Sequence, residues 1–248
     1  CFILEENPDR PIETVAPPDY ARWRDYVPRL TPPWPGRLLS WNVLNPRSME
    51  TMRYNFNPHR EKPALFSGLW AYRRIIDRSY FEAGTYASDL CLVNWPIIDY
   101  MEGDILTCDA AEKNRRLADA RALSLSVLHW LRTEAPRPDG GNGWPDLRLR
   151  GDLLATDDGL AMAPYIRESR RIRAVTTIRE QDVSATHRPG ENLAERYEDS
   201  VGIGYYRIDL HPSTGGDNYV DVPSLPFRRC RRPNRGGSLA TRFGRGRR

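Results

Sequence analysis

The longest regular pattern in the sequence predicts one long helix over residues 109–134. Asp109 and Glu112 have the spacing of a capping box, and both acids favour a helix N-terminus. Pro136 ends the pattern. An apolar stripe recurs at helical spacing through Leu117, Ala120, Ser124, Val127, Leu128 and Leu131. About 25 residues with a rise of 1.5 Å each give a rod of roughly 37 Å, so we expect this helix to cross a whole sheet.

Proline limits what the rest of the chain can form. The sequence has 21 prolines, and seven of them lie between residues 11 and 35, which excludes a second long helix there. We expect one helical turn at 20–26 and short strands at 2–4, 89–95 and 205–210. Residues 69–76 fit a strand, with a helix as the alternative. The aromatic residues of 69–76 and 89–95, together with Tyr100, either line a flat pocket or form core. The predicted fold class is α+β: a mixed, β-rich domain with one long helix.

Composition narrows the class of protein. The chain has 248 residues, 40% of them hydrophobic, and seven tryptophans, which is enough for a real core. No run approaches the ~18 apolar residues of a membrane-spanning helix, and no secretion signal is visible. The sequence therefore predicts a cytoplasmic protein without a membrane partner.

The cysteines argue against a metal centre. Cys1, Cys91, Cys108 and Cys230 lie far apart, and no Cys-x-x-Cys occurs. Zinc and iron–sulfur sites need clustered thiolates. We expect no metal site and free thiols in a reducing compartment.

Arginine is dense between residues 163 and 173. Pro164 favours the start of a strand, and the β-prone run 175–178 would continue it. Four of the seven residues 167–173 are arginine, and guanidinium groups suit phosphate or carboxylate because they offer paired donors. The alternative is a strand with a solvated polar face.

A polar, glycine-containing turn follows at residues 211–218. Its glycines let the backbone approach a ligand closely. His211 is the best general acid–base candidate because histidine titrates near neutral pH. An equally open interpretation is that the ring of His211 only holds the turn in place.

Three segments resemble a family of bacterial FAD-dependent oxidoreductases. They are residues 156–172 (TDDGLAMAPYIRESRRI), residues 94–100 (NWPIIDY), and residues 199–204 (DSVGIG) running into 206–219 (YRIDLHPSTGGDNY). The likeness covers roughly residues 65–227 in the right order. Some relatives resemble heterodisulfide-reductase-type flavin subunits that carry [4Fe–4S] clusters, which the cysteines here do not support.

The resemblance implies FAD as the cofactor and a small molecule as the substrate. In such families FAD lies between a Rossmann-like unit and a second, largely β domain that presents the substrate. No Gly-x-Gly-x-x-Gly occurs in this sequence. We therefore expect this chain to be the substrate-side middle of the enzyme, cut at both ends, with most of the Rossmann-like unit missing. The expected division is a proline- and aromatic-rich excursion with loops at 1–64, the substrate-side domain at 65–227 and a tail at 228–248.

Residue chemistry within the matched motifs gives the candidate site. We expect catalysis to involve His211 and Arg170. We expect contacts with the cofactor from Arg167, Glu168, Asp209, Gly215 and Gly216.

The tail suggests a different class of function. Residues 228–248 carry nine arginines and no acid, whereas residues 1–227 hold 37 − 9 = 28 basic and 33 acidic groups, a net charge of −5. Such a tail resembles a disordered nucleic-acid-binding segment, and nonspecific binding through it is the only nucleic-acid contact we expect. Its abrupt composition also suggests translation in a shifted reading frame. The alternatives to a flavoenzyme fragment are therefore a polyanion binder or an inert truncated fragment.

Overall fold

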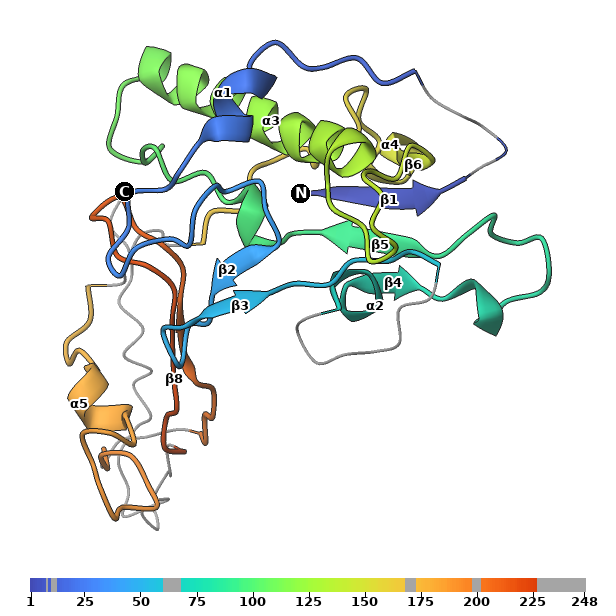
Figure 1. Ribbon diagram of the computed structural model, residues 1–248. Helices are drawn as coiled ribbons and strands as arrows, with labels where there is room; N and C mark the ends of the chain where they lie inside the picture. Colours follow the sequence, from blue (N-terminus) through green and yellow to red (C-terminus); the bar gives the residue numbers. More distant parts are fainter. Residues whose placement is uncertain (8, 10–12, 60–67, 168–172, 198–201, 227–248) are drawn as a thin grey trace. The chain divides into compact units, whose positions relative to one another are not determined.

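The computed structural model describes residues 1–7, 9, 13–59, 68–167, 173–197 and 202–226 (Figure 1). The chain divides into two compact units. The first comprises residues 1–167 and 212–218, and the second comprises residues 168–211 and 219–248. Helices and strands are mixed along the chain, which confirms the α+β class.

The predicted long helix is α3, Ala110–Thr133. Asp109 caps it, because its side chain accepts a hydrogen bond from the backbone N–H of Glu112 at 2.8 Å. Its apolar stripe is buried, with Leu123, Val127 and Leu131 fully inaccessible. Both ends agree with the sequence prediction to within a residue or two.

A four-stranded antiparallel sheet lies beneath α3 in the first unit (Figure 1). Its order is β4 (Arg74–Ile76), β5 (Leu90–Val93), β1 (Phe2–Glu6) and β6 (Leu147–Leu149). In the central strand β1, Leu4 lies opposite Cys91 on one side and Leu149 on the other. The predicted strands at 2–4 and 89–95 are confirmed. The ambiguous segment 69–76 forms both structures, because α2 (Leu69–Tyr72) is followed directly by β4.

An aromatic cluster fills the first unit beside a second small sheet, β2 (Asn42–Leu44) paired with β3 (Thr51–Arg53). Trp41 stacks on Phe56 with centroids 5.6 Å apart. All seven tryptophans are at most 4% exposed. The core interpretation therefore holds for Trp70 and Trp95 of the expected aromatic set, whereas Tyr72 is 40% exposed. The rings that contact one another in this cluster are Trp41, Phe56, Trp70, Trp95, Trp130 and Trp144.

The remaining elements are short, as the proline content predicts. The predicted helical turn at 20–26 is confirmed as α1 (Tyr20–Asp25). The others are the 3₁₀ helices η1 (Arg78–Tyr80) and η2 (Pro96–Ile98), the helices α4 (Gly151–Leu154) and α5 (Glu180–Val183), and the strands β7 (Ile208–Leu210) and β8 (Val220–Val222).

The strand expected over residues 164–178 is not present where the chain is described. Residues 163–167 and 173–178 carry no strand, and 168–172 lie outside the described residues. Val175 is 86% exposed and Ile178 is 52% exposed. The prediction was wrong for these parts because β propensity describes how a side chain fits a half-buried sheet, and the described residues offer no neighbouring strand to pair with.

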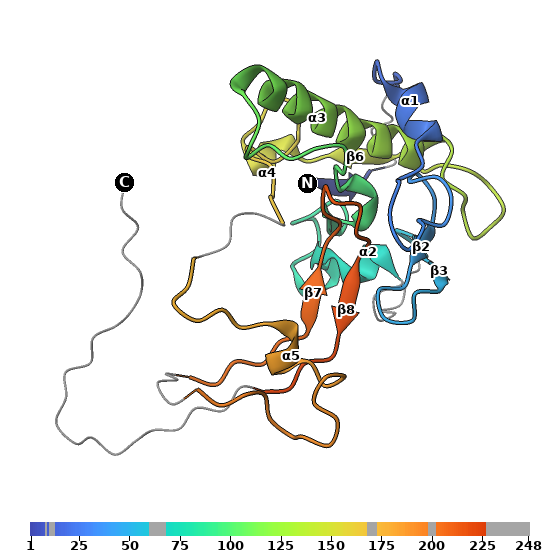
Figure 2. The same cartoon turned by 90° about the vertical axis from the view of Figure 1, so that its left-hand side faces the viewer.

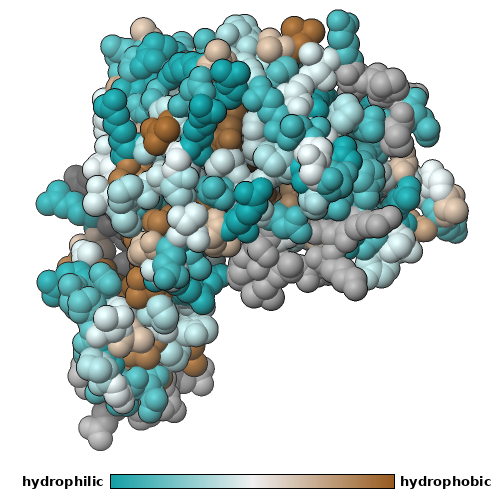
Figure 3. All heavy atoms as spheres, in the orientation of Figure 1, coloured by the Kyte–Doolittle hydropathy of each residue, from teal (hydrophilic) through white to brown (hydrophobic). Residues whose placement is uncertain are grey.

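The surface of the first unit is largely polar. The face of the molecule in Figure 3 is mostly teal or white, with smaller brown areas between the polar side chains. Scattered apolar exposure of this kind is normal for a folded protein. Across the described part of the chain, every helix is too short or too polar to cross a bilayer.

Candidate functional site

Strands β7 and β8 form a hairpin in the second unit with two different faces (Figure 2). The antiparallel register places Asp209 opposite Asp221. Successive side chains in a strand point to opposite faces, so the other face carries only aliphatic residues. These are Ile208 and Leu210 on β7, opposite Val222 and Val220 on β8.

The polar face continues onto the residues that directly adjoin the two strands. Arg207 precedes β7 by one residue, and His211 and Tyr219 flank the connecting loop. We call Arg207, Asp209, His211, Tyr219 and Asp221 the ionisable face of the hairpin. On this face Tyr219 is buried, Arg207, His211 and Asp221 are half-buried, and Asp209 is exposed.

The charges of this face are partly compensated. Arg207 Nη1 lies 3.1 Å from Asp221 Oδ2, and the side chain of Asp221 is 13% exposed. Directly opposed carboxylates repel each other. The positive charge of Arg207 therefore offsets the repulsion between Asp221 and Asp209. Asp209 is exposed and accepts a hydrogen bond from the hydroxyl of Tyr206 at 3.3 Å. It is the carboxylate of the pair that faces solvent.

His211 is held in place by an aromatic neighbour. Its ring meets the ring of Tyr219 edge to face, with centroids 4.9 Å apart. Tyr219 is 7% exposed, whereas His211 is half-buried. A buried phenol therefore fixes the orientation of an imidazole that still reaches the surface. The ring of His211 thus contacts the residue across the turn, and its role as an acid–base group stays a prediction.

The loop of residues 212–218 belongs to the first unit. The carbonyl of Gly216 accepts a hydrogen bond from the backbone N–H of Thr31 at 2.7 Å, and the side chain of Asn218 donates to the carbonyl of Pro32 at 2.7 Å. Gly216 has φ +88°, which requires glycine. The conformation of the turn is thus enough to explain a glycine at position 216. Contact of Gly215 or Gly216 with a cofactor stays a prediction.

Arg167 joins two of the segments that carry the family resemblance. Its Nη2 donates to the carbonyl of Asn94 at 3.1 Å, and its Nε donates to Asp99 Oδ1 at 3.4 Å. The guanidinium also lies over the ring of Tyr165, 4.9 Å from the centroid. The side chain of Arg167 is 19% exposed, and these contacts hold its guanidinium in place. Glu168 and Arg170 lie outside the described residues, and their roles stay predictions.

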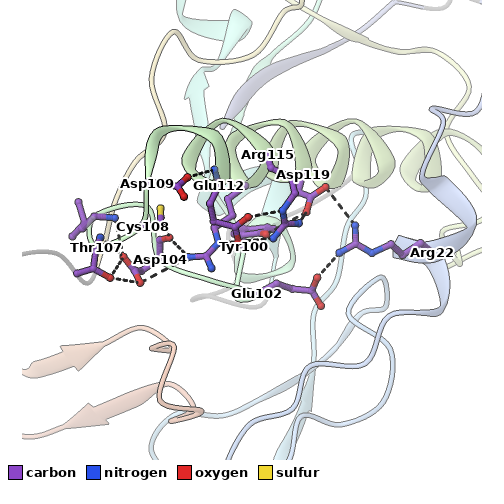
Figure 4. Close-up of polar contacts among 12 residues, drawn as sticks. Arg22, Tyr100, Glu102, Asp104, Thr107, Cys108, Asp109, Glu112, Arg115 and Asp119 are labelled. Atoms are coloured by element: carbon purple, nitrogen blue, oxygen red, sulfur yellow. Dashed lines mark hydrogen bonds and ion pairs between the residues drawn. The ribbon is translucent and has the colours of Figure 1, made fainter.

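A second charged cluster lies at the N-terminal half of α3 (Figure 4). Glu112 pairs with Arg115 and with Arg116, each at 2.7 Å. Hydrogen bonds from Arg115 lower the pKa of Glu112 to about 2. Arg22 on α1 contacts both Glu102 and Asp119, which ties α1 and the preceding loop to α3.

This cluster has a structural role. Nearby, burial raises the pKa of Tyr100 to about 12, so its phenol stays protonated. Sequence reasoning missed the cluster, although the spacing of three and four residues within α3 predicts its intrahelical pairs. The contact of Arg22 with Glu102 has no sequence signal.

The start of α3 does not fit the pyrophosphate of FAD. Anions bind at helix N-termini where backbone N–H groups and the helix dipole are available. Here Asp109 already accepts from the first turn, and Glu112 adds a second negative charge. The other helices described have at most six residues.

No cluster of three or more histidine, cysteine or acidic side chains in the described ranges could hold a metal ion. Cys1, Cys91 and Cys108 are free thiols, and Cys230 lies outside these ranges. The findings therefore do not support a [4Fe–4S] cluster.

Comparison with known proteins gives one match. A family model described as FAD dependent oxidoreductase matches residues 6–228. No curated protein and no solved structure matches the chain.

Proposed function

Because this chain belongs to the family of FAD-dependent oxidoreductases, we propose that it serves the oxidation or reduction of a small polar molecule by bound FAD. The observation that supports this proposal is the ionisable face of the hairpin β7–β8. It gathers an acid–base group, a solvent-facing carboxylate and a fixed ion pair on one rigid element.

FAD, when bound, supplies the redox step. The proton that moves in such a reaction needs a group of the protein to take or give it. We assign this role to the imidazole of His211, because Tyr219 orients it and it remains accessible. In the oxidising direction His211 takes a proton from a hydroxyl or amine of the substrate, and in the reducing direction it returns one.

Asp209 is the proposed anchor for the substrate. Its carboxylate faces solvent on the same face as His211, and it can accept a hydrogen bond from a second hydroxyl or amine. Arg207 and Asp221 do not contact the substrate in this proposal. Their ion pair keeps the two carboxylates of the hairpin from repelling each other. The assignment favours polar substrates that carry at least two donor groups.

Three further points belong to the proposal. We propose that Arg170 and Glu168 take part in the same reaction, as the matched motif suggests. A cytoplasmic location is supported by the three free thiols. Nucleic-acid binding is not proposed, because the arginine tail lies almost entirely beyond the matched residues and outside the described ones.

The test uses the protein purified with its FAD. A panel of small hydroxy and amino compounds is mixed with it without oxygen, and bleaching of the oxidised flavin is followed. With a compound that reduces the wild type, His211→Asn should react about a hundredfold more slowly. His187→Asn is the matched control, because His187 lies in the same unit and only pairs with Glu180 at 3.6 Å. Equal rates for His211→Asn and the wild type would refute the assignment.

A further inference from the structure

The second unit contains a small hollow within one of its own loops. The hollow is lined by residue 188 and residues 190–196, all of which belong to this unit. Its volume is about 390 Å³. Pockets for small molecules span roughly 300–1,000 Å³, so the hollow has room for one small ligand.

Backbone hydrogen bonds hold the wall of this hollow in place. The N–H of Ala194 donates to the carbonyl of Pro226 at 3.2 Å, and the N–H of Glu195 donates to the carbonyl of Asp182 at 2.8 Å. Ala194 is only 2% exposed. The loop is therefore anchored to two other segments of the unit, and the hollow has a defined wall.

Four charged residues line the hollow, two of each sign. Arg188 and Glu195 pair with each other, with Nη1 2.8 Å from Oε2. Glu191 and Arg196 are exposed, and neither forms an ion pair with another described residue. The Nε of Arg188 also has no hydrogen-bond acceptor in the described part of the chain. The hollow therefore offers one uncompensated negative group and one uncompensated positive group.

We propose that this hollow binds a small zwitterion, in which an ammonium and a carboxylate are joined by a short carbon chain. Arg196 takes the carboxylate, because a guanidinium offers paired donors to it. Glu191 accepts hydrogen bonds from the ammonium. A ligand with only one charge would leave either Glu191 or Arg196 without a partner.

The remaining lining limits the size of the ligand. Leu193 is half-buried and Ala194 is buried, and no aromatic residue lines the hollow. The apolar part of the ligand is therefore short. This inference goes beyond the proposed function, because the site lies within one unit and involves neither FAD nor His211.

A set of simple probes tests the two charges separately. L-alanine, β-alanine and γ-aminobutyrate carry both charges at increasing separation, whereas propionate and propylamine each carry one. Residues 1–248 are titrated with each probe at neutral pH in a calorimeter. We expect at least one zwitterion to bind about tenfold or more tightly than propionate and propylamine do, because each of these lacks one charged contact.

Variants assign the contacts to their residues. Arg196→Gln and Glu191→Gln should each weaken binding of that zwitterion about tenfold. Both should fold like the wild type, which circular dichroism checks, because neither side chain has an ion-pair partner among the described residues. Arg173→Gln is the matched control, since Arg173 is exposed in the same unit and does not line the hollow.

The outcomes separate this site from the proposed acid–base chemistry. His211→Asn should bind the zwitterion like the wild type, so either proposal can fail without the other. Absence of binding by all three zwitterions, or equally tight binding of propionate or propylamine, would overturn the inference. So would unchanged binding by both Arg196→Gln and Glu191→Gln, or an equal loss in Arg173→Gln.

Discussion

The rings of His211 and Tyr219 lie at an interplanar angle of 73°, so the edge of one points at the face of the other. The two residues are eight positions apart in sequence, on either side of the loop between β7 and β8. The strand register brings them together, because it pairs Leu210 with Val220 one step earlier. The orientation of the candidate acid–base group therefore depends on a residue across the hairpin.

Replacing Tyr219 should loosen the hairpin in a way that depends on the ring. Tyr219→Leu should lower the free energy of opening of β7 and β8 by about 1 kcal/mol, because an aromatic pair is lost. Tyr219→Phe keeps the pair and should lose much less. Hydrogen exchange of the amides of β7 and β8 measures both. Tyr205→Leu, at a site 73% exposed in the same unit, should change nothing. Equal protection in Tyr219→Leu and Tyr219→Phe would contradict the role of the ring.

The opposed carboxylates make a second prediction. Arg207→Gln should destabilise the hairpin by about 0.5–1 kcal/mol, because Asp209 and Asp221 then face each other with less compensation. Adding Asp209→Asn should recover part of this loss by removing one charge. The same exchange measurement, at low and high salt, gives the double-mutant cycle. If Asp209→Asn recovers none of the loss caused by Arg207→Gln, repulsion between the two carboxylates is excluded.

Acid should destabilise the first unit through Glu112. The pKa of Glu112 is lowered from 4.5 to about 2 in the folded protein, chiefly by hydrogen bonds from Arg115. The folded state therefore binds fewer protons than the unfolded one in this range, and stability falls as the pH drops from about 4.5 towards 2. Glu112→Gln should flatten this part of the profile of unfolding free energy against pH. High salt should flatten it as well, since the pair is exposed.

The connection after α3 should not tolerate a side chain at Gly143. Gly143 has φ +70°, and an added Cβ would overlap the carbonyl of Arg132. We expect Gly143→Ala to lower the free energy of unfolding by more than about 2 kcal/mol. Gly84→Ala is the matched control: its φ is +89° but the space around it is open, so only the backbone term of about 1 kcal/mol applies. Thermal unfolding of the two variants tests this, and equal melting temperatures would exclude the overlap.

Sequence reasoning succeeded where local pattern decides structure. Helix α3 was predicted from its cap and stripe, and β1 and β5 from short apolar runs. The segment 69–76 was ambiguous because it holds a helix and a strand in succession. The strand over 164–178 was wrong in its described parts, since its outcome depends on a partner strand rather than on its own composition.

The residues of the candidate site also fall into two groups: those that the sequence suggested and those that it did not. His211 was suggested by its place beside the polar turn and Asp209 by the matched motif, and the roles of both stay predictions. Tyr219, Asp221 and Arg207 were missed because only the register across the loop places them on the same face. The alternation of Arg207, Asp209 and His211, repeated in Tyr219 and Asp221, was the available signal. This alternation can be recognised only when the two segments are aligned as a hairpin.

The distribution of tryptophan has an optical consequence. All seven tryptophans are in the first unit and at most 4% exposed, and residues 168–211 and 219–248 contain none. Indole emission will therefore be blue-shifted and will move to longer wavelength only when the first unit opens. Melting of the hairpin that carries His211 will leave that emission unchanged. A single unfolding curve from tryptophan would describe the first unit alone, and the unit with the proposed chemistry would be invisible to it.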